Sequence, residues 1–280
     1  MERLFERVGS LLMAALLIGT MAGCAKEPEA VPTTQAELRE TVPTASTTVG
    51  TEPSQSPEPT EPEVVPEPTE TEPVETGPVE TEPVEPEVLF EYRVLHDINP
   101  DLVGWMEIPG TVIDYPVVQS VYEPNFYLRR NFWKVGATCG TLYAREKCDV
   151  FLPADNITIY GHKMAAGTMF ADLHKYKDPA FWEAHKYIRF DTIYEKHEYE
   201  IFAVFVSSAD MSIGYAYHIF DVAKGAEDYD AHIQRLRDLA LYDTGIVPQY
   251  GEKIITLSTC DKSIDQGRLV VVARMVETQV

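Results

Sequence analysis

Cys260, His162 and Arg268 are the residues of this 280-residue sequence whose types and positions best suit covalent chemistry. Cys260 ends the apolar run KIITLST (253–259), and Arg268 opens the next apolar run, RLVVVARMV (268–276). If the two runs pair as an antiparallel hairpin, the thiol and the guanidinium lie at the same end of a sheet. A guanidinium is always charged, so at that place it would favour the thiolate and stabilise an oxyanion.

A nucleophilic thiol also needs a base, and His162 is the strongest candidate. It directly follows the strand-like run NITIYG (156–161), where a loop begins. The other histidines lie among polar residues of expected helices or loops and are interpreted as solvated side chains: His96, His174, His185, His197, His218 and His232. Cys, His and Arg at strand ends together predict a thiol acyl-transfer site.

The remaining cysteines allow other interpretations. Cys139 and Cys148 flank the strand-like GTLYA (140–144), and a hairpin could bring them together as a disulfide. Two free buried thiols are the preferred interpretation, because nothing in the spacing requires a bridge. The sequence has no C-x-x-C or H-x₃-H pair, so no metal site is predicted, and no cofactor either.

Residues 1–24 resemble a lipoprotein signal peptide. Their apolar run of 13 residues (11–23) has the length of a signal-peptide core and is short for a membrane span. It ends in Met-Ala-Gly before Cys24, which resembles a lipobox whose cysteine becomes lipidated. An uncleaved anchor, with Cys24 incidental, is the alternative. In both cases the rest of the chain is expected outside the cytoplasm.

Residues 25–87 are predicted to be a disordered stalk rich in Pro, Glu and Thr. The segment carries a net charge of −14 out of −22 for the chain, and a five-residue unit repeats through 71–85 as TEPVE, TGPVE and TEPVE. Frequent proline and like-charge repulsion prevent such a segment from folding on its own. It is either a spacer or a dispensable linker. No basic patch accompanies it, which argues against nucleic-acid partners.

Residues 88–280 are predicted to form one mainly β domain. Eight strand-like runs, bounded by Gly, Pro, Asp and Asn, suggest a barrel: 104–108, 112–118, 140–144, 156–161, 187–193, 198–206, 253–259 and 268–276. Helices are expected at 88–96, at 168–186 in two pieces broken at Asp178-Pro179, and at 226–241. The last places Tyr229, Ile233, Leu236 and Ala240 on one face that can dock on the barrel.

The domain resembles the sortases, and specifically class B. The stretches that carry the resemblance are TLSTC (256–260) with Arg268, YGHKM (160–164), GTMF (167–170) and NPDLVGWMEIPGTVIDYPVVQ (99–119). The resemblance implies an eight-stranded barrel with an N-terminal helix and a helix between strands six and seven. It also implies a cysteine transpeptidase on the outer face of the plasma membrane of a Gram-positive bacterium.

The resemblance further implies roles for single residues. Cys260 would attack the Thr carbonyl of a C-terminal sorting signal, His162 would shuttle the proton, and Arg268 would hold the oxyanion. An amine of a peptidoglycan precursor (lipid II) or a pilin Lys would then release the acylated surface protein. Four residues match substrate-binding positions: Ser258, Thr259, Asp261 and, more loosely, Leu128.

Two other functions stay open at this stage. A wall cysteine peptidase or amidase would use the same residue types, although papain-like enzymes place Cys before His, and here His162 precedes Cys260 by 98 residues. A lipid-anchored, non-catalytic binding module on the same barrel would have no need of an intact Cys–His–Arg set.

Overall fold

The computed structural model describes residues 86–151 and 154–279. The predictions for residues 1–24, Cys24 included, and for nearly all of 25–87 lie outside the described residues. In the part of the chain that is described, no helix combines the length and apolar character needed to span a membrane.

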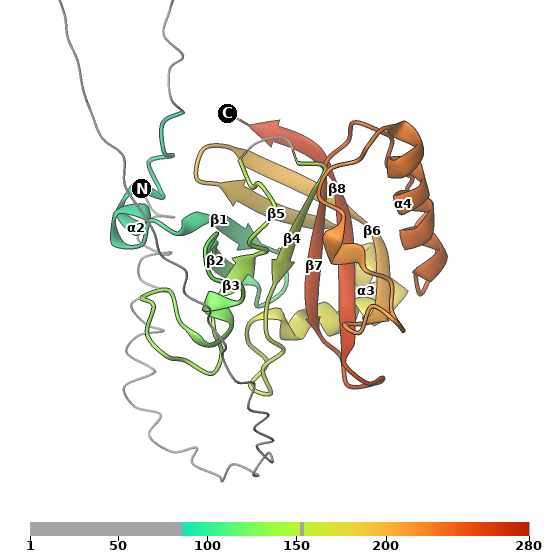
Figure 1. Cartoon of the computed structure of the whole chain (residues 1–280), viewed down its shortest axis with the longest axis horizontal. Coiled ribbons are helices and arrows are strands. Elements are labelled where there is room, and N and C mark those ends of the chain that lie inside the picture. The colour runs from blue at the N-terminus through green and yellow to red at the C-terminus, as the bar shows by residue number, and fades with distance from the viewer. Residues whose placement is uncertain (1–85, 152–153, 280) are drawn as a thin grey trace, which may run out of the picture. The chain divides into compact units, whose positions relative to one another are not determined.

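Eight strands close into a barrel in the order β1-β2-β3-β4-β7-β8-β6-β5 (Figure 1). Their bounds are Leu102–Glu107 (β1), Asp114–Val118 (β2), Leu142–Ala144 (β3), Asn156–Tyr160 (β4), Tyr187–Thr192 (β5), Lys196–Ser208 (β6), Ile254–Cys260 (β7) and Gly267–Gln279 (β8). Neighbours pair antiparallel except β2 with β3 and β4 with β7, which are parallel. Each strand-like run of the sequence overlaps one of these strands, so the predicted mainly β barrel is confirmed.

The barrel is filled by one apolar cluster, to which Met106, Ile159, Leu257 and Val271 belong. These side chains are fully buried because alternate residues of each strand point inward. Because the barrel is closed, every strand is hydrogen-bonded on both sides, and the strands surround the apolar cluster without an unpaired edge.

Helix α4 (Ala226–Leu239) lies between β6 and β7 in the chain and covers the outer face of β6 and β8 (Figure 1). Tyr229, Ile233 and Leu236 are buried against a second apolar cluster that includes Phe205 of β6 and Val272 of β8. This confirms the predicted apolar face for these three residues, whereas the fourth predicted residue, Ala240, follows the end of the helix and is partly buried against the same cluster. The packing of α4 also explains why β6 and β8 are apolar on both faces.

The remaining helices are short. The N-terminal helix α2 (Arg93–Ile98) begins later than the predicted 88–96, while the segment at 168–186 forms the two expected pieces, the 3₁₀ helix η2 (Phe170–Lys177) and α3 (Pro179–Ala184). Asp178 separates them, and its carboxylate accepts a hydrogen bond from Ala180 N–H at 2.9 Å. Two further 3₁₀ turns were not predicted: η1 (Phe126–Arg129) and η3 (Tyr217–Ile219).

Candidate active site

Cys260 and Arg268 are direct partners across the antiparallel β7–β8 ladder, as the sequence predicted. The next pair along has Asp261 N–H donating to Gly267 C=O at 2.8 Å. Hydrogen-bonded and non-hydrogen-bonded pairs alternate in such a ladder, so Cys260 and Arg268 form a non-hydrogen-bonded pair, the kind whose side chains approach most closely. The exposed thiol therefore has a guanidinium on the same face of the sheet.

Arg268 keeps its charge available for a ligand. Its Nη1 donates to the carbonyls of Gln266 (3.2 Å) and Gly267 (3.0 Å), which orient the side chain at the end of β8. Among the described residues, no carboxylate lies within ion-pair distance of this guanidinium. By contrast, Arg274, on the same strand, pairs with Glu200 at 3.0 Å.

His162 lies two residues beyond the end of the neighbouring strand β4, at a position that corresponds to Cys260 on β7. Tyr160 of β4 pairs with Ser258 of β7 in parallel register, and each reactive residue follows two positions beyond that pair (Figure 1). Gly161 allows the main chain to pass close to Leu142, because a Cβ at this position would lie 2.4 Å from a Leu142 methyl group. Packing therefore favours glycine at position 161, between Tyr160 and His162.

Leu128 enters the site through its main chain. The Nε2 atom of His162 lies 2.7 Å from the Leu128 carbonyl oxygen, in η1. A carbonyl oxygen only accepts hydrogen bonds, so Nε2 carries a proton and Nδ1 of the neutral ring is left as the acceptor. The Leu128 side chain is exposed, and its predicted role in substrate binding stays a prediction.

Ser258 and Thr259 are buried, at 1% and 2% exposure. The Ser258 hydroxyl shares a 2.7 Å hydrogen bond with the hydroxyl of Tyr217, which lies in the segment between β6 and α4. The Thr259 hydroxyl is buried without a hydrogen-bond partner. A substrate cannot reach either side chain in this arrangement, so their predicted role in substrate binding would require movement of the overlying segment or contact through the main chain.

Asp261 is also buried, at 4% exposure, and it organises the turn after the nucleophile. Its carboxylate accepts hydrogen bonds from the main chain (2.7 Å) and the hydroxyl of Ser263, and forms an ion pair with Lys177 of η2. Burial opposes ionisation, but these partners prevail and hold the pKa of Asp261 well below its ordinary range. The predicted substrate-binding carboxylate is therefore engaged inside the protein.

His174 is a correction to the sequence analysis, which interpreted it as solvated. Its Nε2 lies 3.0 Å from the carbonyl oxygen of Cys260, and its Nδ1 lies 3.7 Å from Asp261. Burial, and then the charges of Lys163 and Lys177, lower its pKa against the opposing effect of the Cys260 carbonyl and Asp261. The interpretation is also wrong for His197 and His232, which are buried.

Two buried tyrosines flank the Cys260–Arg268 pair. Tyr143 of β3 donates to the Asn125 side chain at 2.9 Å, and Tyr217 lies over Ser258. Burial raises the pKa of both hydroxyls, and Arg268 opposes the rise in each. Both tyrosines are therefore neutral side chains that form hydrogen bonds beside the Cys260–Arg268 pair. Neither was identified from the sequence.

Cys139 and Cys148 are both free thiols rather than a disulfide, but only Cys148 is buried, whereas the preferred interpretation had both thiols buried. Burial raises the pKa of Cys148 to about 11, so this thiol is not a competing nucleophile. Within 86–151 and 154–279, no cluster of three or more His, Cys, Asp or Glu has the geometry of a metal site.

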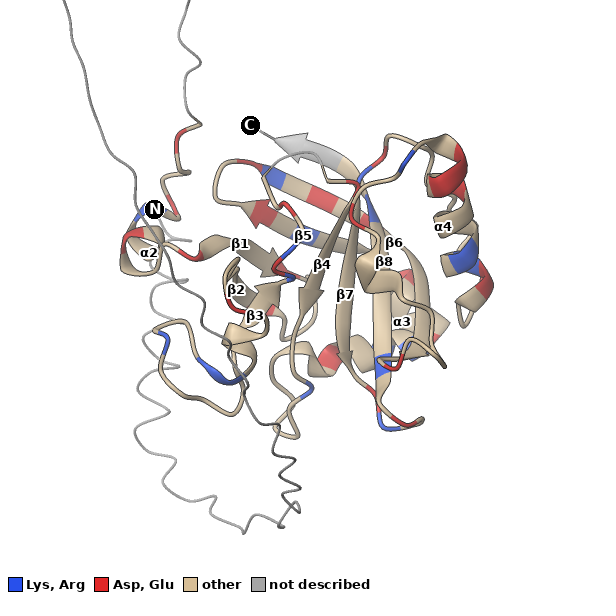
Figure 2. Ribbon diagram, viewed as in Figure 1, with Lys and Arg blue, Asp and Glu red and all other residues tan. Residues whose placement is uncertain are grey.

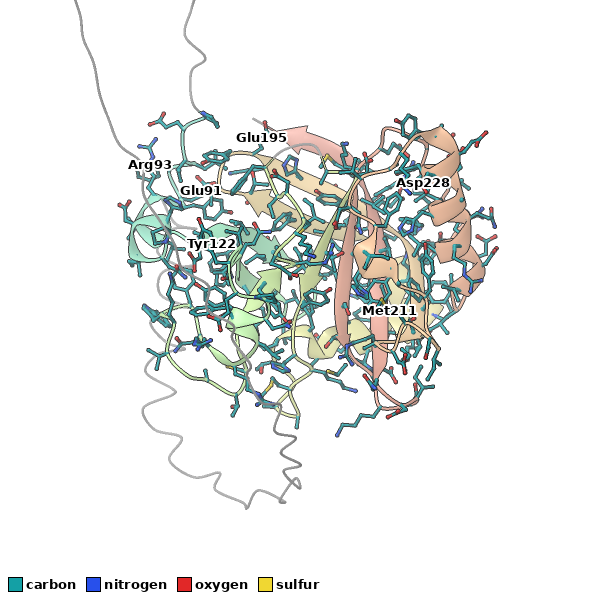
Figure 3. All side chains as sticks on the ribbon, viewed as in Figure 1. Glu91, Arg93, Tyr122, Glu195, Met211 and Asp228 are labelled. Carbon is teal, nitrogen blue, oxygen red and sulfur yellow. The ribbon has the colours of Figure 1, made fainter. Side chains whose placement is uncertain are left out.

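Cys260 and Arg268 line one open pocket together with the intervening turn 261–267, and His162 is not part of its lining. A second hollow lies between α4 and the segment that precedes it, with Met211 and Asp228 in its lining (Figure 3). It contains no Cys or His and shares only Ile264 with the first pocket. Figure 2 shows acidic and basic residues interspersed along the described ribbon.

The comparisons with known proteins agree with this geometry. Residues 106–276 match the family model of the sortase domain. Sortase B of Listeria monocytogenes is 34% identical over 192 residues, which cover 68% of this chain and 76% of that protein. A sortase B-like protein of Bacillus anthracis, 33% identical, superimposes with a TM-score of 0.62 over 68% of this chain and 84% of that one. The structure of the Staphylococcus aureus sortase B–substrate complex, 27% identical, superimposes with a TM-score of 0.62 and covers 68% of this chain and 86% of that one.

Proposed function

Because the chain belongs to the sortase family and is a class B sortase, a cysteine transpeptidase, we propose that Cys260 is its nucleophile. In the first step, the Cys260 sulfur attacks the carbonyl carbon of a Thr in the C-terminal sorting signal of a surface protein. A C–S bond forms, the peptide C–N bond breaks, and the amine-bearing fragment leaves. In the second step, an acceptor amine attacks the thioester, an amide forms, and the thiol is restored.

His162 supplies the proton balance in this proposal. Its Nε2 proton is held by the Leu128 carbonyl, so Nδ1 is the atom that exchanges a proton. The protonated ring donates to the leaving amine, and the neutral ring then accepts a proton from the incoming amine. Cys260 is the last residue of β7, whereas His162 lies in the loop two residues after β4, where its carbonyl accepts a hydrogen bond from Phe170 N–H at 2.9 Å.

Arg268 supplies the electrostatic stabilisation. Its charge stabilises the oxyanion of each tetrahedral intermediate, and removal of one such donor costs about 10²–10³ in rate. The observation that carries the proposal is the Cys260–Arg268 ladder pair, with His162 two residues after the Tyr160–Ser258 pair of the parallel β4–β7 ladder, as Cys260 is on β7.

We further propose that the acceptor is an amine of a peptidoglycan precursor such as lipid II, or a pilin Lys. The enzyme would act on the outer face of the membrane, held there by the N-terminal segment. The family relationship and the lipobox-like Cys24 support this placement.

Amine dependence tests the proposal. The chain is incubated with Pro-x-Thr peptides, with and without glycine-type and diaminopimelate-type amines, and the products are identified by mass spectrometry. A product joined to one amine, formed by the wild type and not by Cys260→Ala, is expected. Hydrolysis that no amine diverts would favour a wall peptidase instead, and a Cys260→Ala variant with unchanged products would exclude Cys260 as nucleophile.

A further inference from the structure

We propose that His174 is a positioning residue that holds the main chain of Cys260 in place of a missing strand. The inference rests on the proposed role of Cys260. It starts from one fact of the ladder: the Cys260 carbonyl belongs to a non-hydrogen-bonded pair with respect to β8, so it points to the other side of β7.

On that other side, β4 has already ended. Gly161 N–H is the last main-chain donor from β4 and bonds to the Ser258 carbonyl at 3.2 Å. The chain then turns away, and Lys163 pairs with Met169 instead of with β7. The Cys260 carbonyl, two residues beyond Ser258, is therefore left without the donor that a longer β4 would provide, and His174 Nε2 occupies that position at 3.0 Å.

The helix that carries His174 connects both sides of the site. At its beginning, Phe170 N–H donates to the His162 carbonyl at 2.9 Å. Within it, His174 bonds to the Cys260 carbonyl, and at its end Lys177 pairs with Asp261. The 3₁₀ helix η2 thus fixes the main chains of the proposed base and nucleophile relative to one another.

The contact with the Cys260 carbonyl determines which nitrogen of the His174 ring carries a proton. The Cys260 carbonyl only accepts, so Nε2 of His174 is the donor. Nδ1 faces the Asp261 carboxylate at 3.7 Å, while Lys163 and Lys177 supply the nearby positive charges. The ring acts through the main chain of Cys260 and touches no reacting atom, which distinguishes it from His162.

A matched pair of variants tests this role. His174→Gln keeps an N–H donor at the same distance along the side chain, whereas His174→Met has a similar length and volume and no donor. We expect His174→Met to lower kcat for peptide cleavage about tenfold with KM near wild type, since it loses one hydrogen bond and the alignment it provides. His174→Gln should restore most of kcat. His96→Gln, on α2, is the control.

A second readout does not depend on peptide chemistry. The rate of Cys260 alkylation by iodoacetamide reports the position and ionisation of the thiol, and it should shift several-fold in His174→Met and little in His174→Gln. Thermal unfolding establishes that each variant is folded. The inference would be overturned if His174→Met had the same kcat and alkylation rate as the wild type, or if His174→Gln were as impaired as His174→Met. Absence of peptide cleavage in the wild type would count against the proposed function, while the alkylation rates would still decide the role of His174.

Discussion

Cys260 and Arg268 face each other across the β7–β8 ladder in a non-hydrogen-bonded pair, so the thiol and the guanidinium share one face at one end of the barrel. The guanidinium is oriented by two main-chain carbonyls of its own turn. This arrangement positions a fixed positive charge where a thiolate and an oxyanion would form.

Arg268→Lys is expected to lower kcat about 100-fold, because an ammonium keeps the charge but lacks the planar fork of donors. Arg274→Lys is the matched control on the same strand, where the guanidinium pairs with Glu200 and Glu252 far from Cys260. The control should keep kcat near wild type. Steady-state kinetics with a cleavable peptide measures both, and equal effects of the two substitutions would show that Arg268 acts through stability alone.

The Tyr217–Ser258 hydrogen bond, at 2.7 Å and buried, is expected to fix the segment before α4 on the strand that carries Cys260. Tyr217→Phe and Ser258→Ala should each cost about 1–3 kcal/mol of unfolding free energy, because each leaves a buried polar group without its partner. The double variant should cost less than the sum of the two. Urea unfolding of the four proteins completes the cycle, and strict additivity would show that the two hydroxyls are not coupled.

Gly161→Ala should destabilise the domain by about 1–3 kcal/mol through overpacking. The added methyl would lie 2.4 Å from Leu142 and 2.6 Å from Phe170, both in the core. Because His162 is the next residue, kcat should fall as well. Gly136→Ala, where a Cβ meets nothing within 4 Å, is the control for both measurements. Wild-type stability in the Gly161 variant would mean that the loop and η2 adjust freely.

His232 is expected to make stability depend on pH. Burial, opposed by Asp228, lowers its pKa from 6.5 to about 4. As the pH falls, the unfolded chain therefore takes up the proton before the folded one does. The contribution of neutral His232 to the free energy of unfolding is therefore fully present above pH 6.5 and is lost as the pH falls from 6.5 to about 4. The total loss is on the order of 3 kcal/mol.

His232→Phe is the matched variant, since it keeps an aromatic ring stacked on Phe220. In the wild type the centroids of the His232 and Phe220 rings are 3.8 Å apart. The difference in unfolding free energy between wild type and variant should shrink or reverse in favour of the variant as the pH falls from 7 to 4. A difference independent of pH would contradict the assignment. Because His174, His197 and His218 also have lowered pKa values, only this difference isolates His232.

The strands could be predicted from the sequence because long runs such as that of β7 are apolar and bounded by turn residues. The site could be predicted in part for the same reason, since Cys260 and Arg268 are neighbours in one hairpin. His162 was found because it ends a strand, although only the parallel β4–β7 register places it level with the thiol. The eight runs already suggested a barrel, but the parallel β4–β7 register was not predicted from the sequence.

His174 and Tyr217 could not be found in this way. His174 contacts a residue 86 positions away. It belongs to a 3₁₀ helix whose buried apolar residues are Phe170, Leu173 and Tyr176, and it is not part of that three-residue repeat. Tyr217 lies in a short turn whose position depends on bonds to β4 and β7, and its presence buries Ser258. Both depend on long-range packing, which a local reading of the chain does not contain.

The most direct test of the central claim is the mass of the protein during turnover. Intact-protein mass spectrometry of the chain with a Pro-x-Thr peptide panel, without amine, should show a gain equal to the peptide fragment ending at Thr less one water, located on Cys260 by digestion. Cys260→Ala should show none, and an added amine should discharge the adduct. An adduct on another residue, or peptide cleavage that persists in Cys260→Ala, would contradict the account.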